Sequence, residues 1–218
     1  MLRFVSAAAM VAGVAGAALA QVNYIYDDGQ MDTAVGPPSS FNPSPQMGWG
    51  NYFVAEEGGE WITTVSAAFG PTFPNLTTVT AWIFDDPDDD FNPGNAVALA
   101  SVTLTPQTIG GSVFTDFNFA PTLVSGGFFV LLVTDTVAGQ DRPAPTDTSG
   151  RTDVSWIVYN PVDQGVNIDN LAANALFSLA APLTPFDGVW MIRASGIPAP
   201  GAGALLALGG LAAARRRR

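Results

Sequence analysis

Between Gln21 and Ile197 the sequence consists of short hydrophobic runs separated by turn residues. The runs are rich in Val, Ile, Phe, Trp and Thr, and clusters of Gly, Pro, Asn and Asp separate them, which is the pattern of a β-sandwich or β-barrel. We expect strands at Val22–Tyr26, Asn51–Ala55, Trp61–Phe69, Thr77–Phe84, Ala96–Thr105, Val113–Phe119, Phe128–Asp135, Val154–Tyr159 and Val189–Ser195.

The alternation of side chains within these runs indicates which face of each strand is buried. Val102 and Leu104 are expected on one face of their strand, with the hydroxyl residues between and beside them on the other. The run from Phe128 to Val133 does not alternate, so we expect it to be buried on both faces and central in its sheet. Helix is scarce: Asn167–Leu176 could form one short helix, and a loop is the alternative.

Two long segments, Gln30–Gly50 and Ala138–Thr152, are rich in Pro, Gly and Asp or Ser, and we expect them to be irregular. The remaining runs are short and numerous, and turn residues separate them at close intervals. The prediction is an all-β fold, a single antiparallel β-sandwich that spans residues 21–196.

The N-terminus has the features of a secretory signal peptide. Arg3 precedes an apolar run from Ala7 to Leu19, and Ala18 and Ala20 supply the small residues that signal peptidase requires. We expect residues 1–20 to form a signal helix that signal peptidase removes after Ala20. A buried N-terminal helix is the alternative, but the Ala- and Gly-rich run has no polar face.

The C-terminus combines an apolar segment, Gly201–Ala214, with the terminal cations Arg215, Arg216, Arg217 and Arg218. As a helix the segment is about 21 Å long at roughly 1.5 Å per residue, shorter than the ~30 Å hydrocarbon core, and it can lodge there if the membrane thins. The arginines would remain in the cytoplasm and leave the domain outside, anchored in the membrane. The alternative is a core helix followed by a basic tail.

Residues 197–218 resemble the PEP-CTERM class of sorting tails, which have a Pro-Glu-Pro motif, a short transmembrane segment and a terminal Arg cluster. Pro198 and Pro200 match the two prolines, whereas Ala199 stands where the family has Glu. The resemblance implies recognition near Pro198 and Pro200 by an exosortase-like membrane protease that removes the tail. Ala199 leaves two outcomes open: cleavage, or retention as a membrane anchor.

The body also resembles known exported domains. Its segments Tyr26-Asp-Asp-Gly, Trp49-Gly-Asn-Tyr-Phe, Asn92-Pro-Gly-Asn and Gly126-Gly-Phe-Phe-Val follow one another as in the jelly-roll-type sandwich of many sorting-tail proteins. Such domains are similar in outline to carbohydrate-binding modules. The resemblance implies a jelly-roll-like topology and leaves the activity open.

The charge of the body excludes some partners. Residues 21–197 hold all 19 acidic residues and three basic ones, Arg142, Arg151 and Arg193, so 3 − 19 gives a formal charge of −16. A domain this acidic repels nucleic acid and anionic lipid headgroups, and we expect neither as its partner.

The absence of His and Cys limits the chemistry of the chain. Disulfides, Cys nucleophiles, Ser-His-Asp triads and the usual zinc sites all need one of these residues. We therefore expect a protein that is not an enzyme, without a catalytic residue or an obligatory cofactor.

The densest cluster of ligand atoms is Asp85-Asp-Pro-Asp-Asp-Asp-Phe-Asn-Pro-Gly-Asn95, between two predicted strands. Asp86, Asp88 and Asp90 follow an i, i+2, i+4 spacing, and calcium prefers such carboxylate and carbonyl oxygens. The EF-hand pattern is missing, because neither its Gly at position six nor its Glu at position twelve is present. The alternatives are a calcium site and a fully solvated acidic turn.

Two further groups of residues relate to glycans. Glu56, Glu57 and Glu60 precede Trp61, and carboxylates beside an aromatic suggest glycoside hydrolysis, although an exposed charged turn is the simpler interpretation. Aromatic residues could form a sugar-stacking platform or could belong to the core; these are Trp49, Trp61, Trp82, Trp156, Trp190, Tyr24, Tyr26, Tyr52 and Tyr159.

The sequence favours an exported, surface-sorted β-sandwich protein, a non-enzymatic matrix or adhesion component or one that binds extracellular polysaccharide. An Asp/Glu-based glycan hydrolase or lyase and a purely structural matrix protein are the alternatives. Tryptophans around an exposed groove would favour glycan binding, and two carboxylates in a cleft would favour the enzyme.

Overall fold

The computed structural model describes residues 21–40, 46–73, 77–107, 109–150, 153–160, 165–179 and 188–199. Within these residues the chain is all-β and its paired strands are antiparallel, as predicted. Helical structure in the same residues is limited to two 3-10 turns, η1 (Pro93–Asn95) and η2 (Leu171–Ala173). The predicted signal helix and the predicted C-terminal apolar helix lie outside the described residues.

Three sheets make up the described structure. A four-stranded sheet has the order β1-β13-β4-β7, formed by β1 (Val22–Tyr24), β13 (Ile192–Ile197), β4 (Trp61–Ala68) and β7 (Phe114–Leu123). A six-stranded sheet has the order β11-β10-β3-β8-β5-β6, formed by β11 (Ala175–Ser178), β10 (Ser155–Tyr159), β3 (Gln46–Val54), β8 (Gly127–Asp135), β5 (Val79–Asp85) and β6 (Val97–Leu104). A three-stranded sheet has the order β12-β9-β2, formed by β12 (Val189–Trp190), β9 (Ala144–Asp147) and β2 (Thr33–Val35).

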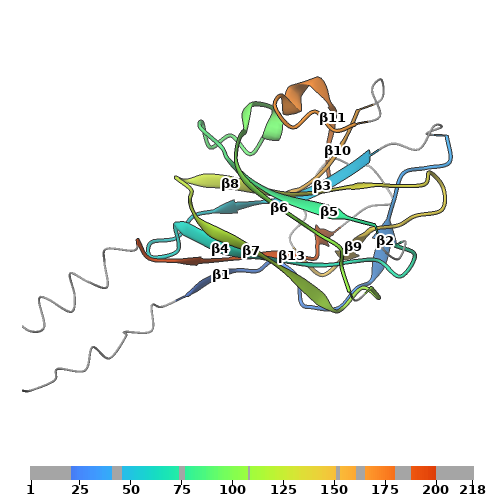
Figure 1. The fold of residues 1–218 in the computed structure, drawn as a ribbon, viewed down its shortest axis with the longest axis horizontal. Helices are drawn as coiled ribbons and strands as arrows, with labels where there is room; N and C mark the ends of the chain where they lie inside the picture. The colour runs from blue at the N-terminus through green and yellow to red at the C-terminus, as the bar shows by residue number, and fades with distance from the viewer. Residues whose placement is uncertain are drawn as a thin grey trace, which may run out of the picture.

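The two larger sheets lie face to face in two layers, and β2 and β9 lie at one end of them (Figure 1). Their facing side chains form one continuous core. Tyr24 of β1 contacts Phe128 of β8, with ring centroids 5.2 Å apart, and Phe53 of β3, at 6.0 Å. Because these aromatic contacts join the two sheets, burial of apolar surface between the sheets holds the layers together.

The outer face of the six-stranded sheet, turned away from the other layer, carries a second hydrophobic cluster. Tyr52, Phe129 and Leu131 belong to this cluster, and Leu171 of η2 packs onto it from the connection between β10 and β11. The ring of Phe91 also covers Tyr52, with centroids 4.3 Å apart. Loops therefore close one part of the outer face, whereas Ser101 and Thr103 of β6, opposite Trp82 and Thr80 of β5, are exposed.

The predicted positions of the strands agree with the structure along most of the body. The run from Phe128 to Val133 is the centre of β8, which lies between β3 and β5 and is buried on both faces, as predicted. Val102 and Leu104 pack against the main core, also as predicted.

Three local predictions were wrong. The segments expected to be irregular, Gln30–Gly50 and Ala138–Thr152, contain β2, the start of β3 and β9. Of the two alternatives for Asn167–Leu176, the helix is wrong: the segment is a loop with the 3-10 turn η2, and β11 begins at Ala175. Pairing with neighbouring strands decided these segments, because β9 pairs with β2 and β11 pairs with β10.

Candidate functional site

The acidic turn, which we define as Asp85–Asp90, begins at the last residue of β5 and precedes η1. It brings together the three carboxylates predicted to bind calcium: one oxygen each of Asp86, Asp88 and Asp90 lies within 4.8 Å of the others. Asp86 is buried, at 1% exposed, whereas Asp88 and Asp90 are exposed. The cluster thus has one member inside the fold and two at its surface.

Electrostatics in the acidic turn follow from this crowding. Burial raises the pKa of Asp86 to about 6; the backbone N–H of Phe91 opposes the shift, and the carboxyl groups of Asp88 and Asp90 add to it. Across the turn, burial raises the pKa of Tyr52 to about 12, and the negative charge of Asp86 adds to that increase. Both shifts indicate a region where negative charge is concentrated and poorly solvated.

A shallow groove lies on the open part of the outer face, and Trp82 of β5 forms part of its wall. The groove has a volume of about 180 Å³, and its lining residues are Gln46, Thr78, Thr80, Trp82, Val133, Thr134, Asp135 and Ile168. Trp82 is half-buried, so part of its indole ring is open to solvent. A second hollow of about 370 Å³ adjoins the first, since Ile168 lines both.

Polar groups in the groove are held in place by hydrogen bonds. Gln46 donates from Nε2 to Asp135 Oδ1 at 3.0 Å, and its Oε1 accepts from the backbone N–H of Val166 at 3.0 Å. Thr80 and Thr103, opposite each other on β5 and β6, share a hydrogen bond of 2.8 Å between their hydroxyls. The groove therefore combines one partly exposed aromatic ring with oriented amide, carboxylate and hydroxyl groups.

The aromatic residues considered for sugar stacking divide between core and surface. Trp49, Trp190, Tyr52 and Tyr24 are buried, at 0 to 4% exposed, which contradicts a surface role for them. The half-buried members are Trp61, Trp82, Trp156, Tyr26 and Tyr159. Trp82 is the one that lines the groove.

The glutamates beside Trp61 lie in a surface turn. Glu56 and Glu57 are exposed, and Glu60 accepts hydrogen bonds from the backbone N–H of Gly58 at 3.1 Å to each carboxylate oxygen. The turn thus uses Glu60 to satisfy its own backbone, in agreement with the expected charged turn. The turn is not a hairpin, because β3 and β4 belong to different sheets.

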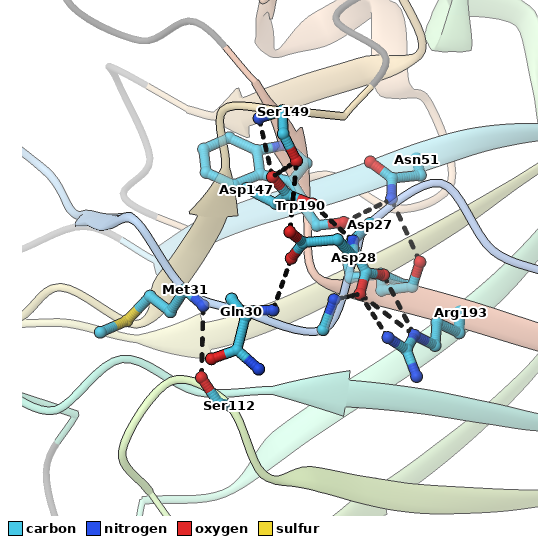
Figure 2. Close-up of polar contacts among 12 residues, drawn as sticks. Asp27, Asp28, Gln30, Met31, Asn51, Ser112, Asp147, Ser149, Trp190 and Arg193 are labelled. Atoms are coloured by element: carbon cyan, nitrogen blue, oxygen red, sulfur yellow. Dashed lines mark hydrogen bonds and ion pairs between the residues drawn. The ribbon is translucent and has the colours of Figure 1, made fainter.

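A buried polar network that the sequence analysis did not anticipate joins the β1–β2 connection to β13 (Figure 2). The Asp27 carboxylate accepts from Arg193 Nη2 at 2.5 Å and from Arg193 Nε at 3.2 and 3.1 Å. The Asp27 side chain is fully buried, and that of Arg193 is 27% exposed. Arg193 is one of three cations in an acidic body, which is the signal that could have drawn attention to it.

Asp147, at the end of β9, extends this network (Figure 2). Its carboxylate accepts from the backbone N–H of Asp28 at 2.5 Å and from the backbone N–H and Oγ of Ser149 at 2.7 and 2.6 Å. Burial raises the pKa of Asp147, but these hydrogen bonds and one from the backbone of Gly150 outweigh it and lower the pKa. Its polar partners hold Asp147 as an anion that fastens two loops.

The residues predicted for processing and anchoring lie mostly beyond the described part of the chain: Ala20, Pro200, Arg215, Arg216, Arg217 and Arg218. Pro198 is described and follows the last residue of β13, and Ala199 is exposed. Among the described residues, no helix is both long and apolar enough to cross a membrane.

Comparisons with known proteins add little to this geometry. No protein-family profile matches the chain, and no curated protein matches it at a significant level. Among solved structures, the chain is similar to the cysteine protease and lectin-like domains of Cwp84, a surface layer associated protein of Clostridium difficile. The two chains share 14% sequence identity with a TM-score of 0.46, and the match covers 71% of this chain and 32% of that chain.

Proposed function

We propose that this chain is an exported, non-enzymatic surface or extracellular-matrix protein that binds a neutral glycan in the Trp82 groove. The observation that carries the proposal is the half-buried Trp82, which lines a groove with oriented polar groups on the outer face of the six-stranded sheet. Binding sites for small ligands combine an apolar wall with a few placed polar groups in this way.

The groove suits the chemistry of a sugar ring. A pyranose has an apolar C–H face, which packs on an aromatic ring, and hydroxyls at its edge that both donate and accept hydrogen bonds. Trp82 supplies the aromatic surface, Gln46 carries amide N–H groups, and the Asp135 carboxylate supplies acceptors. The adjoining hollow beyond Ile168 extends the surface to more than one sugar unit.

Charge selects the class of glycan. The body carries a formal charge of −16, and Asp135 lies in the groove itself. An acidic polysaccharide such as alginate would be repelled, whereas a neutral one meets no electrostatic penalty. Cellulose, chitin and mannan, which are neutral, are therefore the first polysaccharides to test for binding.

We also propose that the fold is a jelly-roll-like β-sandwich. Support comes from the path of the chain, which passes from β3 in one large sheet to β4 in the other, returns for β5 and β6, and crosses again at β7 and β8. Crossings of this kind between two facing antiparallel sheets are typical of jelly rolls.

The localisation is part of the proposal: export through the signal peptide at residues 1–20, then sorting by an exosortase-like protease acting near Pro198 and Pro200. The exposure of Ala199 supports it, because a protease needs an accessible segment directly after the folded domain. Anchoring through Arg215–Arg218 is the state before cleavage, and release into the matrix is the state after it.

The test of the function is affinity electrophoresis of the full-length protein through gels that contain soluble cellulose derivative, glycol chitin, mannan or alginate. Retardation by a neutral polysaccharide and not by alginate supports the proposal. Release of reducing sugars during incubation would favour the hydrolase instead, and migration unchanged in every gel would favour a purely structural role.

A further inference from the structure

The five aspartates of the acidic turn fall into two groups: two accept hydrogen bonds from a neighbouring segment of the chain, and three have their carboxylates close together. Asp85 accepts from the backbone N–H of Ser125 at 3.0 Å, and Asp89 accepts from the backbone N–H of Gly127. These two carboxylates therefore attach the turn to the connection between β7 and β8, at Ser125, and to the first residue of β8, Gly127. The carboxylates of the remaining three, Asp86, Asp88 and Asp90, lie together instead, and Asp86 contributes to the attachment only through its backbone N–H, which donates to the carbonyl of Gly127 at 3.0 Å.

Asp86 gives a second, independent observation. It is 1% exposed, and its Oδ2 accepts from the backbone N–H of Phe91 at 3.3 Å, but its Oδ1 is buried and has no hydrogen-bond partner. A buried carboxylate oxygen without a donor is costly, and the neighbouring carboxyl group of Asp88 offers it no donor when ionised. A cation beside Asp86 Oδ1 would compensate the negative charge of this buried carboxylate.

We propose that Asp86, Asp88 and Asp90 bind one calcium ion, with Asp86 as the ligand from inside the fold. Oxygens on opposite sides of one calcium ion lie about 4.6–5.2 Å apart, at about 2.3–2.6 Å from the metal. The three carboxylate oxygens, all within 4.8 Å of one another, satisfy that limit.

The donor set favours a hard cation such as calcium over soft transition metals. All three side chains offer carboxylate oxygen, and the chain has no His or Cys, so soft transition metals lack their preferred ligands. Two of the three carboxylates are exposed, which leaves room for the water ligands that complete a calcium shell of six to eight oxygens. The site is independent of the Trp82 groove and of the proposed glycan binding.

Calcium titration of the full-length, chelator-treated protein at constant ionic strength tests the proposal. We expect one equivalent of calcium to bind, and millimolar calcium to raise the melting temperature by about 5 °C. Asp88→Asn should weaken calcium binding by about tenfold or more, and Asp86→Asn should abolish the rise in melting temperature. Asp169→Asn, which removes an exposed carboxylate outside the turn, should bind calcium like the wild type.

Two results would overturn the proposal. One is a wild-type protein that shows no heat of calcium binding in titration calorimetry and no change in melting temperature at 10 mM calcium. That concentration is on the order of ten times the dissociation constant of the weakest extracellular calcium modules. The other is an equal rise in melting temperature for wild type and Asp88→Asn, which would show general screening of an acidic surface. Asp88 is exposed, so its variant carries the test even if Asp86→Asn fails to fold.

Discussion

Arg193 Nη2 lies 2.5 Å from Asp27 Oδ1, and this ion pair joins residues 166 positions apart in the chain. Arg193 Nε contacts both oxygens of the same carboxylate, and its guanidinium group lies 4.0 Å from the centroid of the Phe114 ring. The pair therefore connects the segment after β1 with β13, the strand beside β1 in the four-stranded sheet.

Replacement of Arg193 by Ala should lower the free energy of unfolding by about 3 kcal/mol, because it leaves the Asp27 carboxylate buried without its cation. Arg193→Lys should recover only part of the loss, since an ammonium group cannot make the bidentate contact. Urea unfolding followed by tryptophan fluorescence measures both changes. Arg142→Ala, at an exposed arginine, is the matched control and should change stability by less than about 0.5 kcal/mol. Equal stability of Arg193→Ala and the control would contradict this account of the pair.

Asp147 should make stability depend on pH in the acid range. Its folded-state pKa lies below the ordinary value of 3.8, so the stability that its carboxylate contributes is present above about pH 4 and is lost as pH falls through the folded pKa. Asp147→Asn should cost about 1–3 kcal/mol at pH 7, because an amide nitrogen would face N–H donors. The difference between wild type and variant should then shrink below pH 4, as measured by urea unfolding from pH 3 to pH 7. Asp169→Asn should show no such pH-dependent difference, and a gap that stays constant down to pH 3 would argue against the anionic role of Asp147.

Processing at both ends should be visible in the mass of the protein from its native source. We expect the mature chain to begin at Gln21 and the released form to end near Pro198–Pro200, without Arg215–Arg218. Intact-mass and C-terminal peptide analysis of the membrane and secreted fractions measures both ends. Replacement of Pro198 and Pro200 by Ala should keep the arginines on the chain and hold it in the membrane fraction. An intact arginine end in every fraction would refute processing and leave anchoring alone.

The strands with strong local signals could be predicted from the sequence, and those defined by their neighbours could not. Phe128–Val133 has an apolar residue at every position, and such a run without alternation predicts a strand that is buried on both faces. The structure confirms this, because the run is the centre of β8 and all six residues are buried. β2 and β9 are short, and β9 contains Pro145, so the sequence of each is typical of a loop. They form strands because they pair with each other, which the sequence does not show.

The candidate sites show the same division. The i, i+2, i+4 spacing brought Asp86, Asp88 and Asp90 together, because the carboxylates are close in the chain and one turn contains them. Spacing could not show that Asp86 is buried, at 1% exposed, because its burial depends on how the turn packs in the folded chain, where its backbone contacts Gly127 of β8. Nor could it separate Trp49, which faces the other sheet, from Trp82, which faces outward: the two faces of a strand are equivalent until the layers are known.

Affinity electrophoresis of Trp82→Ala tests the central claim most directly. Trp82 forms the aromatic wall of the groove, and Trp61, half-buried on β4 in the other large sheet, gives a matched control of the same residue type. The account predicts that a neutral polysaccharide retards the wild type and Trp61→Ala alike, and that Trp82→Ala loses about tenfold or more in affinity while its circular dichroism stays that of the wild type. Retardation of Trp82→Ala as strong as that of the wild type would contradict glycan binding in the Trp82 groove.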